Sequence, residues 1–308
     1  MRAVAIDAFG ETPAVRQVAE PGPLERDEIL VRVHAAGVNP VDLLIARGLF
    51  TPFPITFPHI LGLDFAGVVE GRGDRVISCR TGDRIYGRAM GTYADYVAVS
   101  EGGTVSRIPE NIDFAQAAAI PSAAMTALTS VEAAGVGEAS RVLIVGAAGG
   151  VGSFAVQFAN ERGAWVIATA RDEDVDYLRR LGAAASVDYT RDDAMFPNAI
   201  DVLLDFASDA PGLTAMSKLV RDGGAVVSTR HVADVESLAK RNVKAFNVAN
   251  SPTAHLLRRI TTAVESGKLE LPAIRTYPLE EAAAALAEFD RGHVRGKLVL
   301  LTVPRRTN

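Results

Sequence analysis

The stretch of residues 141–171 carries the clearest chemical pattern in the chain. An apolar run at 142–145 leads into a glycine-rich turn, and the turn opens a helical pattern. A second apolar run, at 165–168, follows the helical pattern. A strand, a glycine turn, a helix and a second strand in this order are typical of one βαβ unit of a dinucleotide-binding fold. The alternative is a tight turn between strand and helix that binds no ligand.

The glycines of this turn have the spacing that a pyrophosphate needs. Gly149 lets the backbone come close to the phosphates, and Gly152 lets the helix pack against the strand. The helix that begins around Gly150 and Val151 would present its backbone amides and the positive end of its dipole to the phosphates. The first glycine of the usual G-x-G-x-x-G pattern is Ala147 in this chain, with a glycine one position earlier.

The end of the second strand indicates which nicotinamide nucleotide fits. A carboxylate at this place accepts a hydrogen bond from the ribose 2′-hydroxyl group, whereas a basic residue pairs with a 2′-phosphate. The strand ends in Ala170 and Arg171, so a guanidinium suited to phosphate follows a side chain without charge. We therefore expect NADPH as the cofactor. In the alternative interpretations, Arg171 only faces solvent and Asp172 caps the next helix, or Asp172 binds the ribose of NADH.

Composition and charge argue against several other classes of protein. The 308-residue chain has a formal net charge of −5, which argues against the basic surface of a general nucleic-acid binder. Cys79 is the only cysteine, which excludes an intrachain disulfide and a zinc site made of several cysteines. No run approaches the roughly 18 apolar residues that span a membrane, and the first residues do not resemble a secretory signal. We expect a cytoplasmic protein without a membrane or nucleic-acid partner.

The first hundred residues predict a β-rich domain, because short apolar runs alternate there with glycine and proline. The predicted strands are 4–6, 29–33, 65–69, 75–78 and 93–99, and they suggest a compact antiparallel barrel or sandwich. From Asp113, which we expect to cap a helix, an alanine-rich helical segment runs to Gly135.

Strands and helices then alternate through the middle of the chain. The predicted strands are 142–145, 165–169, 185–188, 201–206, 225–229 and 243–248, and the predicted helices are 150–162, 172–181, 211–221 and 234–240. This alternation predicts an α/β fold with a doubly wound parallel sheet of the Rossmann type. Helices at about 252–266 and 279–290 follow, and a last strand at 297–303 is expected to complete the N-terminal domain. The expected domains are a β-rich catalytic domain, 1–117 with 267–308, and a nucleotide-binding domain, 118–266.

Six segments spread along the chain resemble one known family. They are AAGVNPVDLLIARG (35–48), LGLDFAG (61–67), GDRIYG (82–87), GTYADYV (91–97), VLIVGAAGGVG (142–152) and GKLVL (296–300). In this order they are similar to the zinc-free, quinone-oxidoreductase-like (zeta-crystallin-like) branch of the medium-chain dehydrogenase/reductase superfamily. The resemblance covers nearly the whole chain. It implies a GroES-like catalytic domain, a Rossmann domain inserted into it, usually a homodimer, and reduction of quinones, enones or enoyl thioesters with NADPH.

The same resemblance separates this chain from the zinc-dependent relatives. Asn39 matches the position of a cysteine ligand and Leu63 that of a histidine ligand, and neither side chain binds Zn²⁺ as a thiolate or imidazole does. His34 and His59 have no cysteine beside them, so we interpret them as packing or exposed loop residues. We expect no metal in the site.

The resemblance also implies residues that contact the cofactor. Tyr189, in the segment VDYT, matches a tyrosine that contacts the adenosine phosphate, and Thr126 and Lys297 match positions that line the cofactor pocket. Phe246 and Val248 are expected on the loop after the last strand of the nucleotide-binding domain, near the nicotinamide.

Four further residues have open interpretations. Phe206 and Ala207 follow the fourth strand of the sheet, where ligands collect, so we expect them to form walls of the site; core packing is the alternative. By resemblance, Asn39 would lie beside the nicotinamide ribose or carboxamide, and its amide suits the orientation of an enone. The alternative for Asn39 is a role in a turn. We interpret Asp42 as a helix N-cap, with a site residue as the alternative.

The acceptor half of the site departs from the family pattern. In members that resemble this chain, a tyrosine follows the Asn-Pro-x-Asp motif and another lies near the next glycine, but this chain has Leu44 and Phe50. The predicted substrate pocket is therefore apolar there, beside the apolar loop 51–57, and suits a small hydrophobic quinone or α,β-unsaturated carbonyl compound. Because no side chain is a convincing acid, we expect the proton to come from water.

Two other functions stay open. One is an enoyl-thioester reductase of a biosynthetic pathway, which needs a basic groove; Arg47, Arg88, Arg258 and Arg259 are the candidates. The other is a non-catalytic NADPH-binding sensor or structural protein that has kept the cofactor fold.

Overall fold

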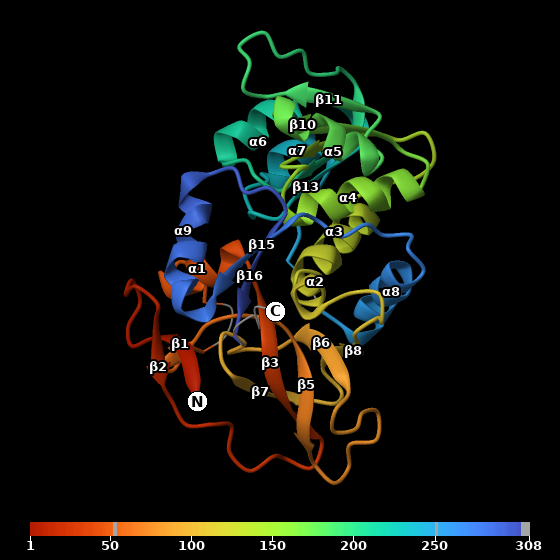
Figure 1. The fold of residues 1–308 in the computed structure, drawn as a ribbon. Helices are drawn as coiled ribbons and strands as arrows, with labels where there is room; N and C mark the ends of the chain where they lie inside the picture. The colour runs from red at the N-terminus through yellow and green to blue at the C-terminus, as the bar shows by residue number, and fades with distance from the viewer. Residues whose placement is uncertain (52–53, 250–251, 303–308) are drawn as a thin grey trace. The chain divides into compact units, whose positions relative to one another are not determined.

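The computed structural model describes residues 1–51, 54–249 and 252–302 (Figure 1). The chain divides into two compact units. Unit 1 comprises Met1–Ser122 and Pro252–Asn308, and unit 2 comprises Ala123–Ser251. Helix α8 (Ala254–Glu265), which we predicted in the nucleotide-binding domain, is part of unit 1. Its residues Leu257, Ile260 and Val264 are buried, and the hydroxyl groups of Thr261 and Tyr86 lie 2.7 Å apart in a hydrogen bond.

Unit 1 is built on two β-sheets (Figure 1). The larger has the strand order β15-β16-β3-β5-β6-β8, with β7 also paired to β3, and the smaller has the order β2-β1-β4. The strands are β1 (Arg2–Ile6), β2 (Ala14–Gln17), β3 (Glu28–Val38), β4 (His59–Ile60), β5 (Asp64–Arg72), β6 (Arg84–Arg88), β7 (Tyr96–Ser100), β8 (Thr104–Arg107), β15 (Ile274–Pro278) and β16 (Lys297–Leu301). Besides α8, the helices are α1 (Pro40–Ala46), α2 (Phe114–Ala118) and α9 (Ala282–Ala287), with 3₁₀ turns η2 (Leu279–Glu281) and η3 (Glu288–Arg291).

Two predictions about unit 1 have clear outcomes. Strand β16 pairs with β3, with Leu298 opposite Val38, so the last strand does complete the N-terminal domain. The predicted strand at 75–78 is wrong. The backbone amides of Ile77 and Ser78 donate to the carboxylate of Glu101 and not to a neighbouring strand, and the segment is irregular.

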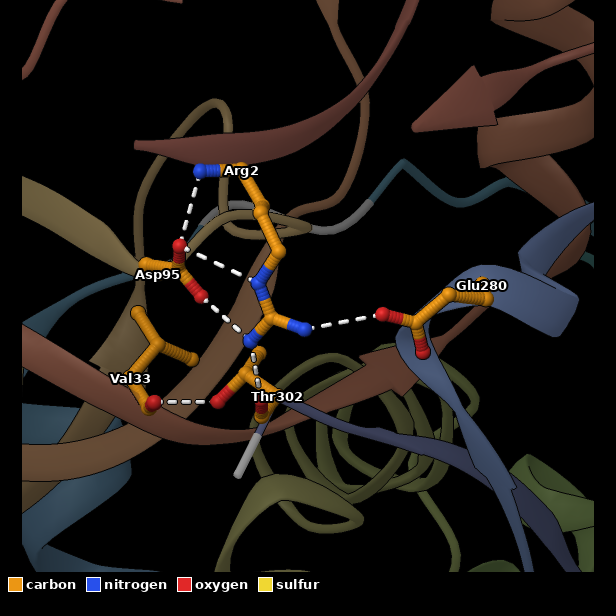
Figure 2. Close-up of polar contacts among 5 residues, drawn as sticks. All are labelled: Arg2, Val33, Asp95, Glu280 and Thr302. Carbon is orange, nitrogen blue, oxygen red and sulfur yellow. Dashed lines mark hydrogen bonds and ion pairs between the residues drawn. The ribbon is translucent and has the colours of Figure 1, made fainter. Parts of the chain in front are cut away.

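Arg2, the first residue of β1, connects this strand by hydrogen bonds to the end of β16 (Figure 2). Its Nη2 donates to Asp95 Oδ1 at 2.8 Å and to the Thr302 carbonyl oxygen at 2.6 Å, and its Nη1 donates to Glu280 Oε1 at 2.8 Å. The Thr302 hydroxyl in turn donates to the carbonyl oxygen of Val33 in β3. These bonds fix the end of β16 against β3, and β16 begins at a residue of the candidate site.

Unit 2 contains a six-stranded parallel sheet with the order β11-β10-β9-β12-β13-β14. The strands are β9 (Arg141–Val145), β10 (Trp165–Ala170), β11 (Ala185–Asp188), β12 (Ile200–Asp205), β13 (Val220–Ser228) and β14 (Lys244–Asn247). The helices are α4 (Gly150–Glu161), α5 (Val175–Arg180) after the 3₁₀ turn η1 (Asp172–Asp174), α6 (Ala210–Ser217) and α7 (Val235–Lys240), and α3 (Pro121–Ala133) crosses the boundary between the units. The order confirms the predicted doubly wound sheet, and the switch point between β9 and β12 is where such folds bind ligands.

Two local predictions about unit 2 differ from the structure. The helix predicted at 211–221 ends at Ser217, because Val220 already pairs with Ile200 as the first residue of β13. Phe246 lies within β14, opposite Val227, and not on the loop after it, whereas Val248 directly follows the strand. None of the helices in the described residues is long and apolar enough to cross a membrane.

Candidate active site

The glycine turn of unit 2 has a geometry that only glycine allows at two positions. Gly146, after β9, has a φ of +76°, and its amide donates to the Thr169 hydroxyl at 3.1 Å. A Cβ atom on Gly152 would lie 2.2 Å from the Gly146 carbonyl oxygen and 2.6 Å from the Ala147 Cα. The helix can therefore approach the turn closely only because residue 152 has no side chain.

The start of α4 offers backbone donors to an anion. Gly149 is the N-cap residue, and no side chain caps the helix there. The amides of Gly150 and Val151, in the first turn, have no carbonyl group four residues earlier within the helix. A pyrophosphate fits these donors and the positive end of the dipole of this 12-residue helix.

The loop after β12 lies beside the glycine turn. The amide of Phe206 donates to the Val145 carbonyl oxygen at 3.1 Å, and a Cβ atom on Gly146 would lie 3.0 Å from the Cβ of Ala207. Asp205, which our sequence analysis did not single out, holds this loop by accepting from the amides of Ala207 at 3.0 Å and of the next residue at 2.8 Å. Ala207 is exposed, so core packing does not explain it.

The structure brings Arg171 and Tyr189 together at the ends of two neighbouring strands. Ala170 in β10 is paired with Asp188 in β11, so the residues that follow them are close in space. Arg171 Nε donates to the Tyr189 hydroxyl at 3.3 Å, and this hydrogen bond raises the pKa of Arg171. Tyr189 is exposed and Arg171 is half-buried, and Asp172 begins η1 next to Arg171. The guanidinium group of Arg171 is thus held by a hydrogen bond at Nε, and its two terminal amino groups can bind an anion.

The remaining predicted residues of unit 2 take different places. Thr126 lies in α3 and is half-buried, and its carbonyl oxygen accepts from the Ser130 hydroxyl at 2.8 Å. Phe246 is half-buried in β14, whereas Val248 is buried and its amide donates to the Ser228 carbonyl oxygen at 2.9 Å.

A buried polar cluster forms the centre of unit 1. Asn39 accepts at Oδ1 from Lys297 Nζ at 2.7 Å, and its Nδ2 donates to Asp64 Oδ2 at 3.0 Å and to the Gly37 carbonyl oxygen at 3.4 Å. Lys297 Nζ also donates to the Val38 carbonyl oxygen at 2.9 Å. Both Asn39 amide hydrogens therefore have acceptors inside the unit, so donation from Asn39 to an acceptor carbonyl requires one of these bonds to break.

Asp42 has a larger role than the helix cap that we predicted. The N-cap of α1 is Asn39, and Asp42, in the third helical position, accepts from the Asn39 amide at 2.9 Å. The same oxygen, Oδ2, accepts from the Tyr93 hydroxyl at 2.6 Å. Burial raises the pKa of Asp42 to about 7, although the bonds from Tyr93 and Asn39 oppose this shift. Burial also raises the pKa of Tyr93 and lowers that of Lys297.

Asp64, Tyr93 and Ser122 belong to this cluster, and our sequence analysis named none of them as site residues. The Ser122 hydroxyl donates to Asp64 Oδ1 at 2.6 Å. The signal was present in two cases, because Asp64 and Tyr93 stand inside the segments LGLDFAG and GTYADYV, which we used only for the resemblance. Ser122 had no comparable signal.

The donors of this cluster do not fit a zinc ion. Asn39 Oδ1 already faces the Lys297 ammonium group, and the side chain of Leu63 is apolar and buried. Burial raises the pKa of Cys79, the single cysteine, which disfavours the thiolate that zinc binds.

An exposed apolar surface lies around the end of α1. Leu44 and Phe50, predicted to form the substrate pocket, have exposed fractions of 40% and 38%. Phe9 and Phe57 are also exposed, and their rings pack edge to face with centroids 5.1 Å apart. Of the apolar loop 51–57, residues 52 and 53 lie outside the described residues.

Comparisons with known proteins give a consistent result. Residues 25–110 match the family described as "Alcohol dehydrogenase GroES-like domain", and residues 181–300 match the family described as "Zinc-binding dehydrogenase". A quinone oxidoreductase of Sus scrofa is 32% identical over 327 residues, which cover 98% of this chain and 98% of that protein.

Two further relatives extend the comparison. The chloroplastic "NADPH-dependent alkenal/one oxidoreductase" of Arabidopsis thaliana is 30% identical over 298 residues, covering 91% of this chain and 74% of that protein. The solved structure of the quinone oxidoreductase from Coxiella burnetii has a TM-score of 0.87 and 30% identity, covering 98% of this chain and 99% of that one.

Proposed function

Because this chain belongs to the quinone-oxidoreductase-like branch of the medium-chain dehydrogenase/reductase superfamily, we propose that it reduces quinones or α,β-unsaturated carbonyl compounds with NADPH. It is an oxidoreductase with a nicotinamide cofactor. The pairing of Arg171 with Tyr189, next to the uncharged Ala170, is the observation that carries the choice of NADPH.

Unit 2 supplies the binding surface for the nucleotide. The pyrophosphate lies at the start of α4, on the amides of Gly150 and Val151 after Gly149. Arg171 binds the 2′-phosphate as a fork, and the Tyr189 hydroxyl adds a hydrogen bond. Phe206, Ala207, Thr126, Phe246 and Val248 complete the walls toward the nicotinamide.

Unit 1 supplies the residues for the acceptor. The apolar surface formed by Leu44, Phe50, Phe9 and Phe57 takes a planar hydrophobic substrate and removes water from it. Asn39 fixes the side chains of Lys297 and Asp64 around it, so its contribution is positional. Bound NADPH supplies the hydride, and water supplies the proton. No zinc takes part, because the cluster lacks thiolate and imidazole ligands.

The other functions have less support. A thioester reductase needs a groove of basic side chains for a phosphopantetheine arm, and one of the four candidate arginines, Arg47, is already ion-paired with Asp290. A non-catalytic NADPH-binding sensor would explain why the two tyrosines of the family pattern are absent. It would not explain the exposed apolar surface at Leu44 and Phe50, which suits a hydrophobic substrate. We also propose a cytoplasmic homodimer, for which light scattering and cell fractionation are the tests.

A parallel assay tests the proposed function. NADPH and NADH are each offered with a set of quinones, alkenals and enoyl thioesters, and oxidation is followed at the nicotinamide absorbance band. We expect rapid NADPH oxidation with quinones or alkenals and slow reaction with thioesters. Tight NADPH binding without oxidation by any acceptor would instead identify a sensor.

A further inference from the structure

Arg88 is a half-buried cation without a carboxylate partner. It is the last residue of β6, and its Cα is in register with that of Asp64 on β5. Within the described residues, the only hydrogen bond of its side chain runs from Nε to the Ser122 hydroxyl oxygen at 3.3 Å, and the side chain forms no ion pair. Two other arginines of unit 1, Arg2 and Arg47, are paired with carboxylates. Arg88 therefore lies beside the buried polar cluster, and most of the N–H donors of the Arg88 guanidinium are unused.

Strand alternation explains where the guanidinium group lies. Arg84, Tyr86 and Arg88 face the same side of β6. Arg84 lies 4.8 Å above the ring of Phe114, and Tyr86 is fully buried against Thr261. Arg88, at the end of the strand, is only half-buried, and none of its nitrogen atoms is among the buried polar atoms without a partner. Its two terminal amino groups therefore reach solvent while Nε is anchored.

Ser122 connects this cation to the buried polar cluster. Its hydroxyl donates to Asp64 Oδ1 at 2.6 Å, so its oxygen can accept from Arg88 Nε. Asp64 accepts from Asn39 Nδ2 on its other oxygen. Three successive hydrogen bonds thus join Arg88 to Asn39, and the first of them holds Nε of the guanidinium at Ser122 before any ligand arrives. A donor that is oriented in advance stabilises developing charge most effectively.

We propose that Arg88 is a catalytic residue that binds the carbonyl oxygen of the acceptor; this rests on the proposed reductase function. Hydride addition forms a C–H bond at the β-carbon and breaks the C=C π bond, whose electrons move onto the carbonyl oxygen. Arg88 donates hydrogen bonds to that oxygen as its negative charge grows. Arg88 acts only as a hydrogen-bond donor, and water supplies the proton that completes the reduction. Arg88 thus provides the polar contact that Leu44 and Phe50 cannot make.

Three variants test the proposal on the full chain. Arg88→Met removes the fork, Arg88→Lys keeps the charge, and Arg107→Met is the matched control. Arg107 lies on the neighbouring strand β8, has a side chain that is 66% exposed and pairs with Asp83. NADPH affinity is measured for each variant by fluorescence titration, and kcat and KM are measured with one enone and one quinone.

We expect Arg88→Met to lower kcat about 100-fold with little change in KM, because the charge develops only in the transition state. Arg88→Lys should recover part of this loss, Arg107→Met should match the wild type, and added guanidinium ion should restore part of the Arg88→Met activity. NADPH affinity should stay unchanged in all three variants.

The outcomes separate this proposal from the proposed function. An active wild type with an equally active Arg88→Met variant overturns the role of Arg88 and leaves the reductase function in place. A rise in KM alone also overturns it, since the residue then binds substrate and transition state equally. If Arg88→Met does not fold, Arg88→Lys decides: a kcat at least about tenfold lower supports the proposal, and an unchanged kcat overturns it.

Discussion

Tyr93 donates a hydrogen bond of 2.6 Å to Asp42, and both side chains are completely buried. The bond stabilises the carboxylate form of Asp42, yet burial outweighs it and the pKa of Asp42 is raised to about 7. The second carboxylate oxygen, Oδ1, has no hydrogen-bond partner within the described residues. A neutral carboxylic acid is therefore the favoured form of Asp42 in the folded protein below pH 7.

This ionisation predicts a pH-dependent stability. Between pH 4 and 7 the unfolded chain loses the Asp42 proton while the folded protein keeps it, so the free energy of unfolding falls as the pH rises. Asp42→Asn keeps an oxygen that accepts from Tyr93 but cannot ionise. The free energy of unfolding of the wild type should therefore fall between pH 5 and pH 8 relative to that of the variant, by on the order of 2–3 kcal/mol. Urea unfolding followed by circular dichroism measures this, and a difference that does not vary with pH contradicts it.

Lys297 predicts a coupling energy within the same cluster. Lys297→Met removes the ammonium group from Asn39 Oδ1 and leaves the buried Asp64 without its compensating charge, which should lower the free energy of unfolding by about 3–5 kcal/mol. Adding Asp64→Asn removes the uncompensated charge. The double variant should therefore lose less than the sum of the two single variants. Strict additivity in a double-mutant cycle contradicts the coupling.

The cluster also indicates what the sequence could and could not reveal. The glycine turn and the alternating strands of unit 2 were predictable, because local periodicity and short motifs encode them. The contact between Asn39 and Lys297 spans 258 residues, and no local pattern specifies it. The resemblance to the family assigned both residues to the cofactor pocket. Only the folded structure shows that the Lys297 ammonium group donates a hydrogen bond to Asn39 Oδ1.

The errors in secondary structure have the same physical origin. The helix predicted to continue to residue 221 has suitable local composition, but pairing of Val220 with Ile200 starts a strand there. The sequence from Arg75 to Ser78 predicted a strand, but the backbone amide of Ile77 donates a hydrogen bond to the Glu101 carboxylate instead. In both places a partner distant in sequence overrides the local preference.

Gly152 predicts a steric limit on the glycine turn. A methyl group at this position would lie 2.2 Å from the Gly146 carbonyl oxygen, so Gly152→Ala should displace α4 and lower the free energy of unfolding by about 1–3 kcal/mol. NADPH affinity should fall as well, because the helix start moves away from the phosphates. Gly137→Ala is the matched control, since nothing lies within 4 Å of its added Cβ. Equal behaviour of the two variants contradicts the prediction.

Arg171 predicts the selectivity between the two nicotinamide nucleotides. Its guanidinium is held by Tyr189 at Nε and keeps its terminal amino groups for a 2′-phosphate. Arg171→Ala should raise the dissociation constant for NADPH about 10- to 100-fold, the range expected for lost hydrogen bonds to a charged group, and leave that for NADH unchanged. Isothermal titration with both nucleotides measures these constants. Arg179→Ala is the control, because this arginine belongs to the same unit but is exposed and pairs with Asp176. Equal weakening of NADPH and NADH binding in Arg171→Ala would mean that the residue does not contact the 2′-phosphate, and Asp172 would then be the residue to test for binding the ribose of NADH.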